Sequence, residues 1–150
     1  MPSQTQSSQA HYQTAYFIVR WILGIIFLMA GYWKVFVFSV NEHAHQFFVT
    51  AYTDSWIPQW MLSLLGILIP YWELAAGLLL IIGFRIREVL ASLGVLLMIT
   101  TYGHALREPL FDITGHTFSR LALIIFLLLM FQYKDRLSVD AWLEQSQADK

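Results

Sequence analysis

The feature that most constrains this chain is the grouping of its apolar residues into long blocks that contain almost no charge. A bilayer core is crossed by about 20 apolar residues in one helix. Soluble proteins have about a quarter of their residues charged, whereas only 13% are charged here, so much of the chain must lie in lipid. We therefore predict an all-α integral membrane protein, a four-helix bundle. The four expected spans are residues 15–40, 56–84, 89–105 and 117–133, of which the last is short.

The chain divides into three parts by composition. Residues 1–14 form a polar tail that we expect to be disordered, residues 15–136 form the membrane domain, and residues 137–150 form a short soluble C-terminal tail. The first span is expected to be retained rather than cleaved as a signal peptide. No basic residue occurs in residues 1–10, and no small-residue cleavage site closes a short apolar run.

The distribution of Lys and Arg predicts the orientation, because cytoplasmic loops of membrane proteins are enriched in these residues. With four crossings, both termini and the turn at 84–88 lie on one side of the membrane. We therefore expect a multi-pass protein of the cell inner membrane with both termini in the cytoplasm. The basic residues on that side are Arg85, Arg87, Lys134, Arg136 and Lys150, and those on the other side are Lys34, Arg107 and Arg120.

Charge and cysteine content exclude several classes of function. A net charge of −1 and a pI of about 6.5 argue against nucleic acid as a partner, because binding to phosphates requires a clustered excess of Lys and Arg. The chain has no cysteine, which excludes disulfides, thiol relays, iron–sulfur clusters and thiolate zinc sites. No phosphate-binding loop, serine nucleophile motif or zinc-protease motif occurs. Whether the protein is catalytic is left open.

Small and charged residues recur at helical spacing in the first two spans. A charge within a span costs on the order of 3 kcal/mol on insertion scales, so it should face the protein interior and have a partner. Glycines on the same face allow a neighbouring backbone to approach closely. We therefore expect the two faces to meet. They are formed by Arg20, Gly24, Phe27, Gly31 and Lys34 in the first span and by Gly66, Pro70, Glu73 and Gly77 in the second.

Depth along the helices predicts a polar cluster centred on Glu73. At about 1.5 Å of rise per residue, Glu73 lies level with Lys34 and Arg120, and His104 lies just above them. This cluster is expected to bind a ligand or to handle protons. Arg20 lies lower, and either belongs to the cluster or extends to the cytoplasmic interface. A purely structural role, in which a buried Glu–Arg pair only fixes helix register, is an equally weighted alternative.

The histidines suggest a second, weaker hypothesis. Four of them fall on the outer side of the predicted topology, where carboxylates also occur, and such nitrogen and oxygen ligands suit zinc or copper(II). Loop histidines are more often simply solvated, and a bis-histidine haem site is the least favoured reading. The four are His43, His45, His104 and His116.

Three stretches of the chain resemble the signatures of DoxX-like membrane proteins. They are the Arg/Gly/Gly/Lys face in 20–34, the Glu-Leu-Ala-Ala-Gly stretch that opens 73–85, and Leu-Ser-Val-Asp-Ala-Trp at 137–142. The resemblance covers about residues 15–143 and implies a four-helix bundle of the inner membrane. Some relatives are subunits of thiosulfate:quinone oxidoreductase, and others accompany redox-defence or metal-responsive peptide-modification systems.

The same resemblance bears on individual residues. It implies that Arg20, Lys34 and Glu73 match charged positions of the DoxX-like family, and that His104 matches a histidine late in its third helix. A thiol-bearing branch related to MauE and to the quinone-linked vitamin K epoxide reductases is set apart from this chain, because the chain has no cysteine.

Three functions fit these observations. The first is a membrane subunit of a quinone-linked redox system that depends on a partner protein. A quinone needs an apolar slot and polar groups for its oxygens, and Arg120, Lys34 or His104 offers such a group. The second is a non-catalytic accessory or scaffold that holds a partner, a peptide or a metal at the outer face. The third is a small-solute carrier that acts as a homo-oligomer. The lipid bilayer is a partner in all three.

Overall fold

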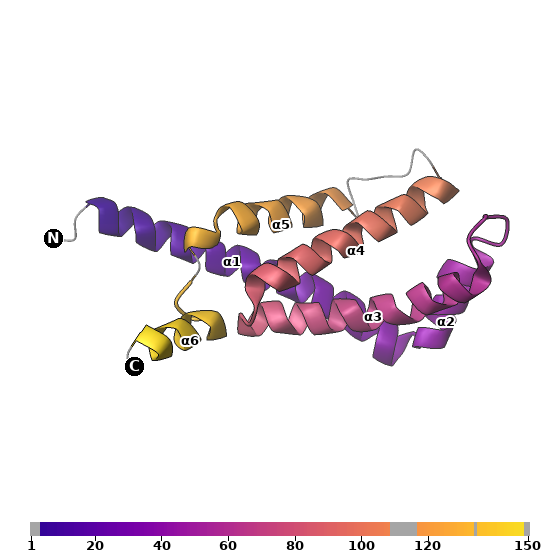
Figure 1. Ribbon diagram of the computed structural model, residues 1–150, viewed down its shortest axis with the longest axis horizontal. Helices are drawn as coiled ribbons and strands as arrows, with labels where there is room; N and C mark the ends of the chain where they lie inside the picture. Colours follow the sequence, from indigo (N-terminus) through magenta and orange to yellow (C-terminus); the bar gives the residue numbers. More distant parts are fainter. Residues whose placement is uncertain (1–3, 109–116, 134, 149–150) are drawn as a thin grey trace.

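The computed structural model describes residues 4–108, 117–133 and 135–148, which form helices joined by short turns (Figure 1). No strand occurs in these ranges, so the predicted all-α class is confirmed. Two π-helical turns, Trp33–Val37 and His45–Thr50, follow α1 and α2, and a 3-10 turn, Phe131–Tyr133, follows α5. The α-helices are α1 (Gln4–Tyr32), α2 (Val40–Ala44), α3 (Gln59–Ile82), α4 (Ile86–Arg107), α5 (Ser119–Leu129) and α6 (Val139–Ala148).

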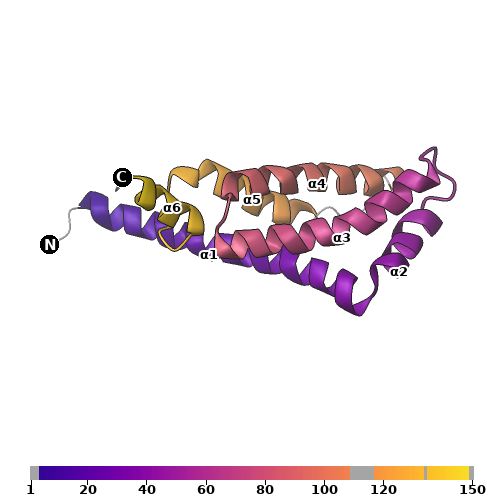
Figure 2. The same ribbon diagram turned by 60° about the horizontal axis from the view of Figure 1, so that its bottom comes forward.

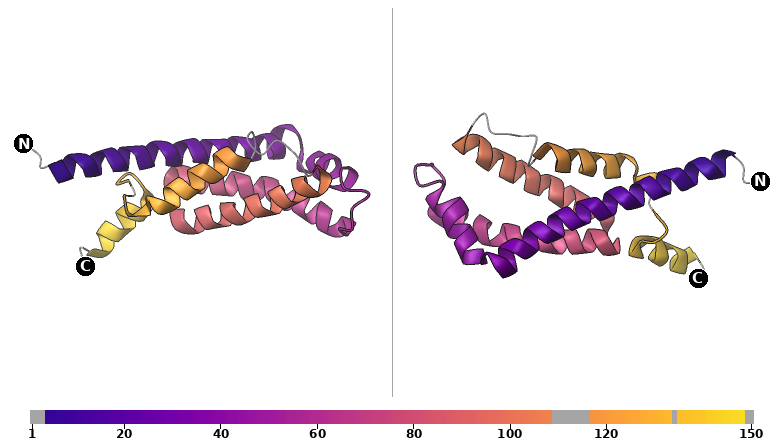
Figure 3. Two further views of the ribbon diagram at one scale, coloured as in Figure 1. Left: turned by 90° about the horizontal axis from the view of Figure 1, so that it is seen from above. Right: turned by 180° about the vertical axis from the view of Figure 1, so that it is seen from behind.

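Helices α1, α3, α4 and α5 run in alternating directions, so that α1 begins and α6 ends at the same end of the molecule (Figure 1). We call this the terminal end and the opposite end the loop end. At the terminal end the first turns of α1 project beyond the end of α5 (Figure 3). At the loop end α2 folds back against α3 (Figure 2).

Three helical stretches are long and apolar enough to cross a membrane, namely Ser8–Val37, Gln59–Ile82 and Ile86–Arg107. The expected fourth span at 117–133 is also apolar, but its helix α5 has only 11 residues. At 1.5 Å per residue this helix is about 16 Å long, roughly half the thickness of a bilayer core. The described part of the chain therefore has three helices able to span a membrane, whereas the fourth crossing and the side of the membrane that the terminal end faces stay predictions.

Glycines allow α1 and α3 to pack backbone against backbone. A Cβ atom added to Gly31 would lie 2.4 Å from the backbone nitrogen of Leu74, and one added to Gly77 would lie 2.3 Å from that of Leu28. No side chain fits at such a distance, so only glycine permits this contact. The prediction that the small-residue faces of the first two spans meet is thus confirmed.

The outer surface of the bundle is apolar. Large side chains such as Leu78, Met98 and Leu129 are exposed on three different helices, while Phe27, Leu80 and similar residues fill the core between α1, α3, α4 and α5. A water-soluble protein rarely exposes so much contiguous apolar surface. Contact with lipid accounts for it.

The close contact between α1 and α3 gives a stability prediction with a matched control. Gly77→Ala should lower the thermal midpoint in detergent, because the new methyl group forces two backbones apart, at about 1–3 kcal/mol for an overpacked site. Gly94→Ala should leave it unchanged or raise it slightly, since a Cβ there meets open space and Ala favours helix over Gly. Equal melting curves for the two variants would contradict this packing.

Candidate functional site

Two ion pairs tie α1 and the turn that continues it to distant segments of the chain. Arg20 pairs with Asp135, and Lys34 pairs with Glu73. The two cations are about 21 Å apart along the helix at 1.5 Å per residue. The structure therefore contains two separate polar clusters where the sequence suggested that Arg20 and Glu73 could belong to one.

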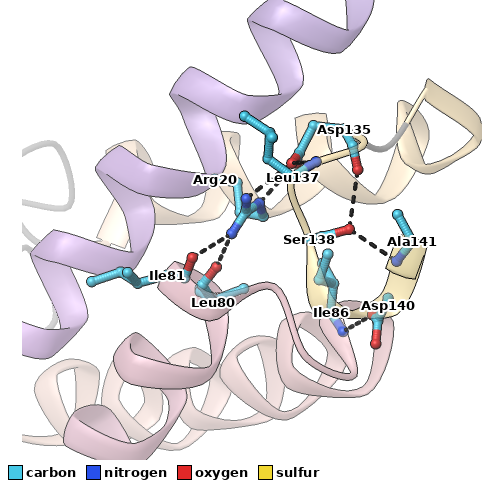
Figure 4. Close-up of polar contacts among 9 residues, drawn as sticks. All are labelled: Arg20, Leu80, Ile81, Ile86, Asp135, Leu137, Ser138, Asp140 and Ala141. Atoms are coloured by element: carbon cyan, nitrogen blue, oxygen red, sulfur yellow. Dashed lines mark hydrogen bonds and ion pairs between the residues drawn. The ribbon is translucent and has the colours of Figure 1, made fainter. Parts of the chain in front are cut away.

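Arg20 is completely buried at the terminal end, where its guanidinium group meets α3 and the segment that follows α5 (Figure 4). Its Nε and Nη2 atoms donate to the two carboxylate oxygens of Asp135 at 2.9 and 3.1 Å. Its Nη1 atom donates to the carbonyl of Ile81 at 2.8 Å and to that of Leu80. The last carbonyls of a helix have no partner within it, so Arg20 caps α3 while it neutralises a buried carboxylate.

The residues that follow Asp135 add further hydrogen bonds to this cluster. Ser138 caps α6 by accepting from the backbone nitrogen of Ala141 at 3.2 Å. Asp140 accepts from the backbone nitrogens of Arg85 and Ile86 at 2.8 and 2.9 Å, and thereby caps α4 from a different helix. Residues 137–148, expected to be a soluble tail, thus lie against the α3–α4 turn, and the C-terminal helix is part of the structure.

Gly83 is what allows the C-terminal segment to come so close. It ends α3 in the left-handed conformation with φ of 72°, which glycine adopts without strain. An added Cβ would lie 2.5 Å from the Cβ of Ser138. The turn therefore requires glycine both for its backbone conformation and for the contact with Ser138.

Asp135 is neither of the two surroundings that the sequence predicts for Arg20, which are the Glu73 cluster and the cytoplasmic interface. The sequence does contain a clue to this pair. An arginine buried in the first span requires an acid at the same depth in the membrane, and Asp135 lies just after the last apolar block. Tyr16, one helical turn before Arg20, is also fully buried, and its hydroxyl makes no hydrogen bond with the described residues.

The second cluster lies in the middle of the bundle and is formed by Lys34 and Glu73. The Lys34 Nζ atom donates to Oε2 of Glu73, with 21% of the lysine side chain and 5% of the glutamate side chain exposed. Lys34 belongs to the π-helical turn that continues α1, and Glu73 lies one helical turn before Gly77 on α3. The sequence-based expectation that these two residues meet is borne out.

His43 lies near this pair and compensates for a proline. Pro70 is inside α3 and has no N–H group, so the carbonyl of Gly66, four residues earlier, has no helical partner. The Nδ1 atom of His43 lies 2.8 Å from this oxygen. Because a carbonyl can only accept, Nδ1 carries a proton and donates it to Gly66, and in the neutral imidazole Nε2 is then the acceptor. His43 on α2 thus supplies the hydrogen bond that Pro70 cannot donate.

Arg120 and His104 are not joined to Glu73 by any ion pair among the described residues. The Cζ atom of Arg120 instead lies 5.5 Å from the ring centre of Phe27. His104 is exposed near the end of α4. The predicted cluster therefore reduces to the pair of Lys34 and Glu73, with His43 as a neighbour that sequence reasoning had considered only for metal binding.

The metal hypothesis is not supported further by the structure. In the described ranges, no group of three or more His, Asp or Glu side chains is arranged to hold an ion. His45 lies 3.5 Å from the hydroxyl of Thr50, and His43 is bonded to the backbone of Gly66. His116 lies outside the described residues, so metal binding by the four histidines stays a prediction.

An all-helical chain with three spanning helices, whose embedded ion pairs lie inside the bundle, defines a small integral membrane protein. A family model described as methylamine utilisation protein MauE matches residues 12–108, and the chain belongs to this family. Neither the curated proteins nor the solved structures yielded a significant match.

The family match corrects the resemblance to DoxX-like proteins, which is wrong. Two of the three stretches behind that resemblance, 20–34 and 73–85, are the faces on which α1 and α3 pack. Glycines and buried charges at helical spacing occur wherever two membrane spans pack closely. Such a pattern therefore does not distinguish one family from another. The absence of cysteine was likewise not a valid reason to set the MauE family apart.

The cluster around Arg20 should be important for stability. Asp135→Ala leaves a buried guanidinium without its counter-charge and should destabilise the protein by about 3–5 kcal/mol. Arg136→Ala, at the exposed neighbouring position, should melt like wild type. Thermal unfolding of both variants in the same detergent measures the difference, and an unchanged midpoint for Asp135→Ala would show that Arg20 is stabilised in another way.

His43 should make stability depend on pH. Burial, aided by Lys34, lowers the pKa of His43 from its ordinary value of 6.5, against the opposing effects of the Gly66 hydrogen bond and Glu73. A lowered pKa means that the unfolded chain binds the proton more readily, so stability is complete above about pH 6.5 and is lost as the pH falls.

Melting curves between about pH 5 and 8 test this expectation. His43→Asn keeps an N–H donor for Gly66 and should flatten the acid side of the profile. His45→Asn, at an exposed position, should retain it. A wild-type slope in His43→Asn would assign the pH dependence to another group.

Proposed function

We propose that this protein is a membrane accessory component of a methylamine utilisation redox system, and that it acts on a partner protein rather than by turning over a substrate alone. The observation that carries this proposal is the match of the MauE family model to residues 12–108. That segment includes α1 from residue 12 onward and all of α2 to α4, and with them both partners of the Lys34–Glu73 pair.

The composition of the chain supports an accessory role. It contains no cysteine, so it has no thiol with which to pass electrons or to exchange disulfides. Any electron transfer in such a system must therefore run through a partner or a bound cofactor. We include in this proposal the quinone that the sequence predicts as a cofactor. If it is bound, it should co-purify with the protein after mild extraction, and mass spectrometry would detect it.

We place the functional site at Lys34 and Glu73. Ionisable residues inside a membrane domain are expensive to bury and commonly mark sites of function. This pair is partly accessible through Lys34 and lies near His43, whose Nε2 atom has no hydrogen-bond partner among the described residues. The cluster at Arg20 is completely enclosed and caps two helices, which is typical of a structural role.

The proposed orientation places the terminal end in the cytoplasm. Arg85, Arg87 and Arg136 are exposed at that end, and basic residues beside the spans favour the cytoplasmic side. The Lys34–Glu73 pair then lies closer to the outer face of the inner membrane than the Arg20 cluster does.

A deletion strain of the source organism tests the proposal. It should fail to grow on methylamine and grow normally on a substrate that contains no amine. Wild type and Gly94→Ala should restore growth, whereas the double variant Lys34→Met/Glu73→Leu should not. Normal growth of the deletion strain on methylamine would overturn the proposal.

The double variant separates a functional role from a structural one. Removing both charges of a buried pair is often neutral for stability, whereas Glu73→Leu alone leaves an unpaired cation and should cost about 3–5 kcal/mol. The double variant should therefore melt near wild type and still fail to support growth. Growth with the double variant would show that the pair only holds α1 against α3.

A further inference from the structure

A cavity of about 260 Å³ lies at the terminal end, between the start of α4, the 3-10 turn after α5 and one face of α6. The helix α4, which is long and apolar enough to cross a membrane, begins at Ile86 beside this cavity. The cavity therefore lies at the level where lipid head groups meet a spanning helix. Its charged lining residues are Arg85, Arg87, Glu88, Asp140 and Glu144.

The three charged side chains at the start of α4 are available to a ligand. Arg85, Arg87 and Glu88 are exposed, and they form no ion pair with one another in the described part of the chain. The carboxylate of Asp140 is already used, because it accepts from the backbone nitrogens of Arg85 and Ile86. Its charge is offset by the positive end of α4. The cavity thus offers two guanidinium groups and the Glu88 carboxylate.

Charges of both signs favour a head group that is itself zwitterionic. An arginine matches a phosphate with paired N–H donors, and a primary ammonium has three N–H donors for a carboxylate. A quaternary ammonium has none and is bound instead by several aromatic rings, whereas Phe131 is the one aromatic side chain among the described residues that line this cavity. An anionic head group would meet three lining carboxylates and only two arginines. These comparisons favour phosphoethanolamine.

The exposed face of α4 provides a path for an acyl chain that starts at the cavity. Ala91 is four residues after Arg87 and therefore adjoins it on the helix surface, and Val95 and Met98 continue the same face. All of these residues are exposed. Gly94 lies beside them, and even a Cβ atom added to it would meet open space. This face is apolar and shallow, as contact with a hydrocarbon chain requires.

We propose that the cavity binds the head group of phosphatidylethanolamine. Arg85 and Arg87 donate to its phosphate, Glu88 accepts from its ammonium, and one acyl chain follows the exposed face of α4 from Ala91 onward. Phe131 and Leu143, which also line the cavity, add apolar contacts from the other two walls. The site depends neither on the Lys34–Glu73 pair nor on the proposed function.

Native mass spectrometry of the full chain in detergent tests the proposal with lipids that share the same acyl chains. Phosphatidylethanolamine should be retained about tenfold better than phosphatidylcholine, the change that one hydrogen bond to a charged group produces, and better than phosphatidylglycerol. Glu88→Gln should remove the preference over phosphatidylcholine. Glu42→Gln, at an exposed position on α2, should preserve it. An unchanged preference in Glu88→Gln, or phosphatidylglycerol retained as well as phosphatidylethanolamine by wild type, would overturn the proposal.

Two further pairs of variants test the phosphate and the acyl chain separately. Arg87→Gln should reduce retention of phosphatidylethanolamine and phosphatidylcholine alike, because both carry the phosphate, whereas Arg107→Gln at the other end of α4 should not. Ala91→Trp obstructs the path of the acyl chain at an exposed position where folding does not depend on the side chain, and should also reduce retention. Ala122→Trp on the exposed face of α5 is its control. Wild-type retention in Ala91→Trp would contradict the proposed path.

Discussion

The backbones of α1 and α3 touch at Gly31 and Gly77, and this contact determines where the charges of the bundle lie. With no side chains between them, the two helices run close enough for Lys34 to reach Glu73 beyond one end of the contact. Toward the other end, Arg20 is brought within reach of the last carbonyls of α3. Both embedded cations of α1 therefore depend on the same packing, and neither could be satisfied if the helices moved apart by the width of one methyl group.

Side chains supply the hydrogen bonds that the backbone of the bundle cannot make for itself. Arg20 binds the C-terminal carbonyls of α3, Asp140 binds the N-terminal amides of α4, and His43 binds the carbonyl that Pro70 leaves open in α3. In lipid no water is present to replace such bonds, so each unsatisfied group costs several kcal/mol. Arg20, Asp140 and His43 thus lie where the helices of this apolar chain are interrupted, whereas the Lys34–Glu73 pair and Arg120 do not follow this pattern.

The spacing of apolar, small and charged residues predicted most of the helices and one of the two ion pairs. The apolar blocks gave the helices, and the spacing of glycines and charges correctly paired the faces of α1 and α3, including Lys34 with Glu73. Arg20 and Asp135 are 115 residues apart, and no repeat connects a span with an irregular segment at that distance. His43 could be placed only by noticing which carbonyl Pro70 leaves open. Family assignment failed because motifs made of packing residues describe how two helices fit together and carry little information about ancestry.

The pairing of Arg20 with Asp135 has a consequence for biosynthesis. Arg20 enters the membrane with the first span, while its counter-ion is 115 residues from it in the chain and is synthesised after α3, α4 and α5. Throughout insertion of the intervening helices the first span carries a charge without its final partner. The α3 carbonyls become available to it first, and Asp135 arrives only after α5 has been synthesised. A chain interrupted before that point keeps a partly satisfied arginine in lipid, so the membrane-inserted fragment differs from the finished protein in a way that cellular quality control can recognise.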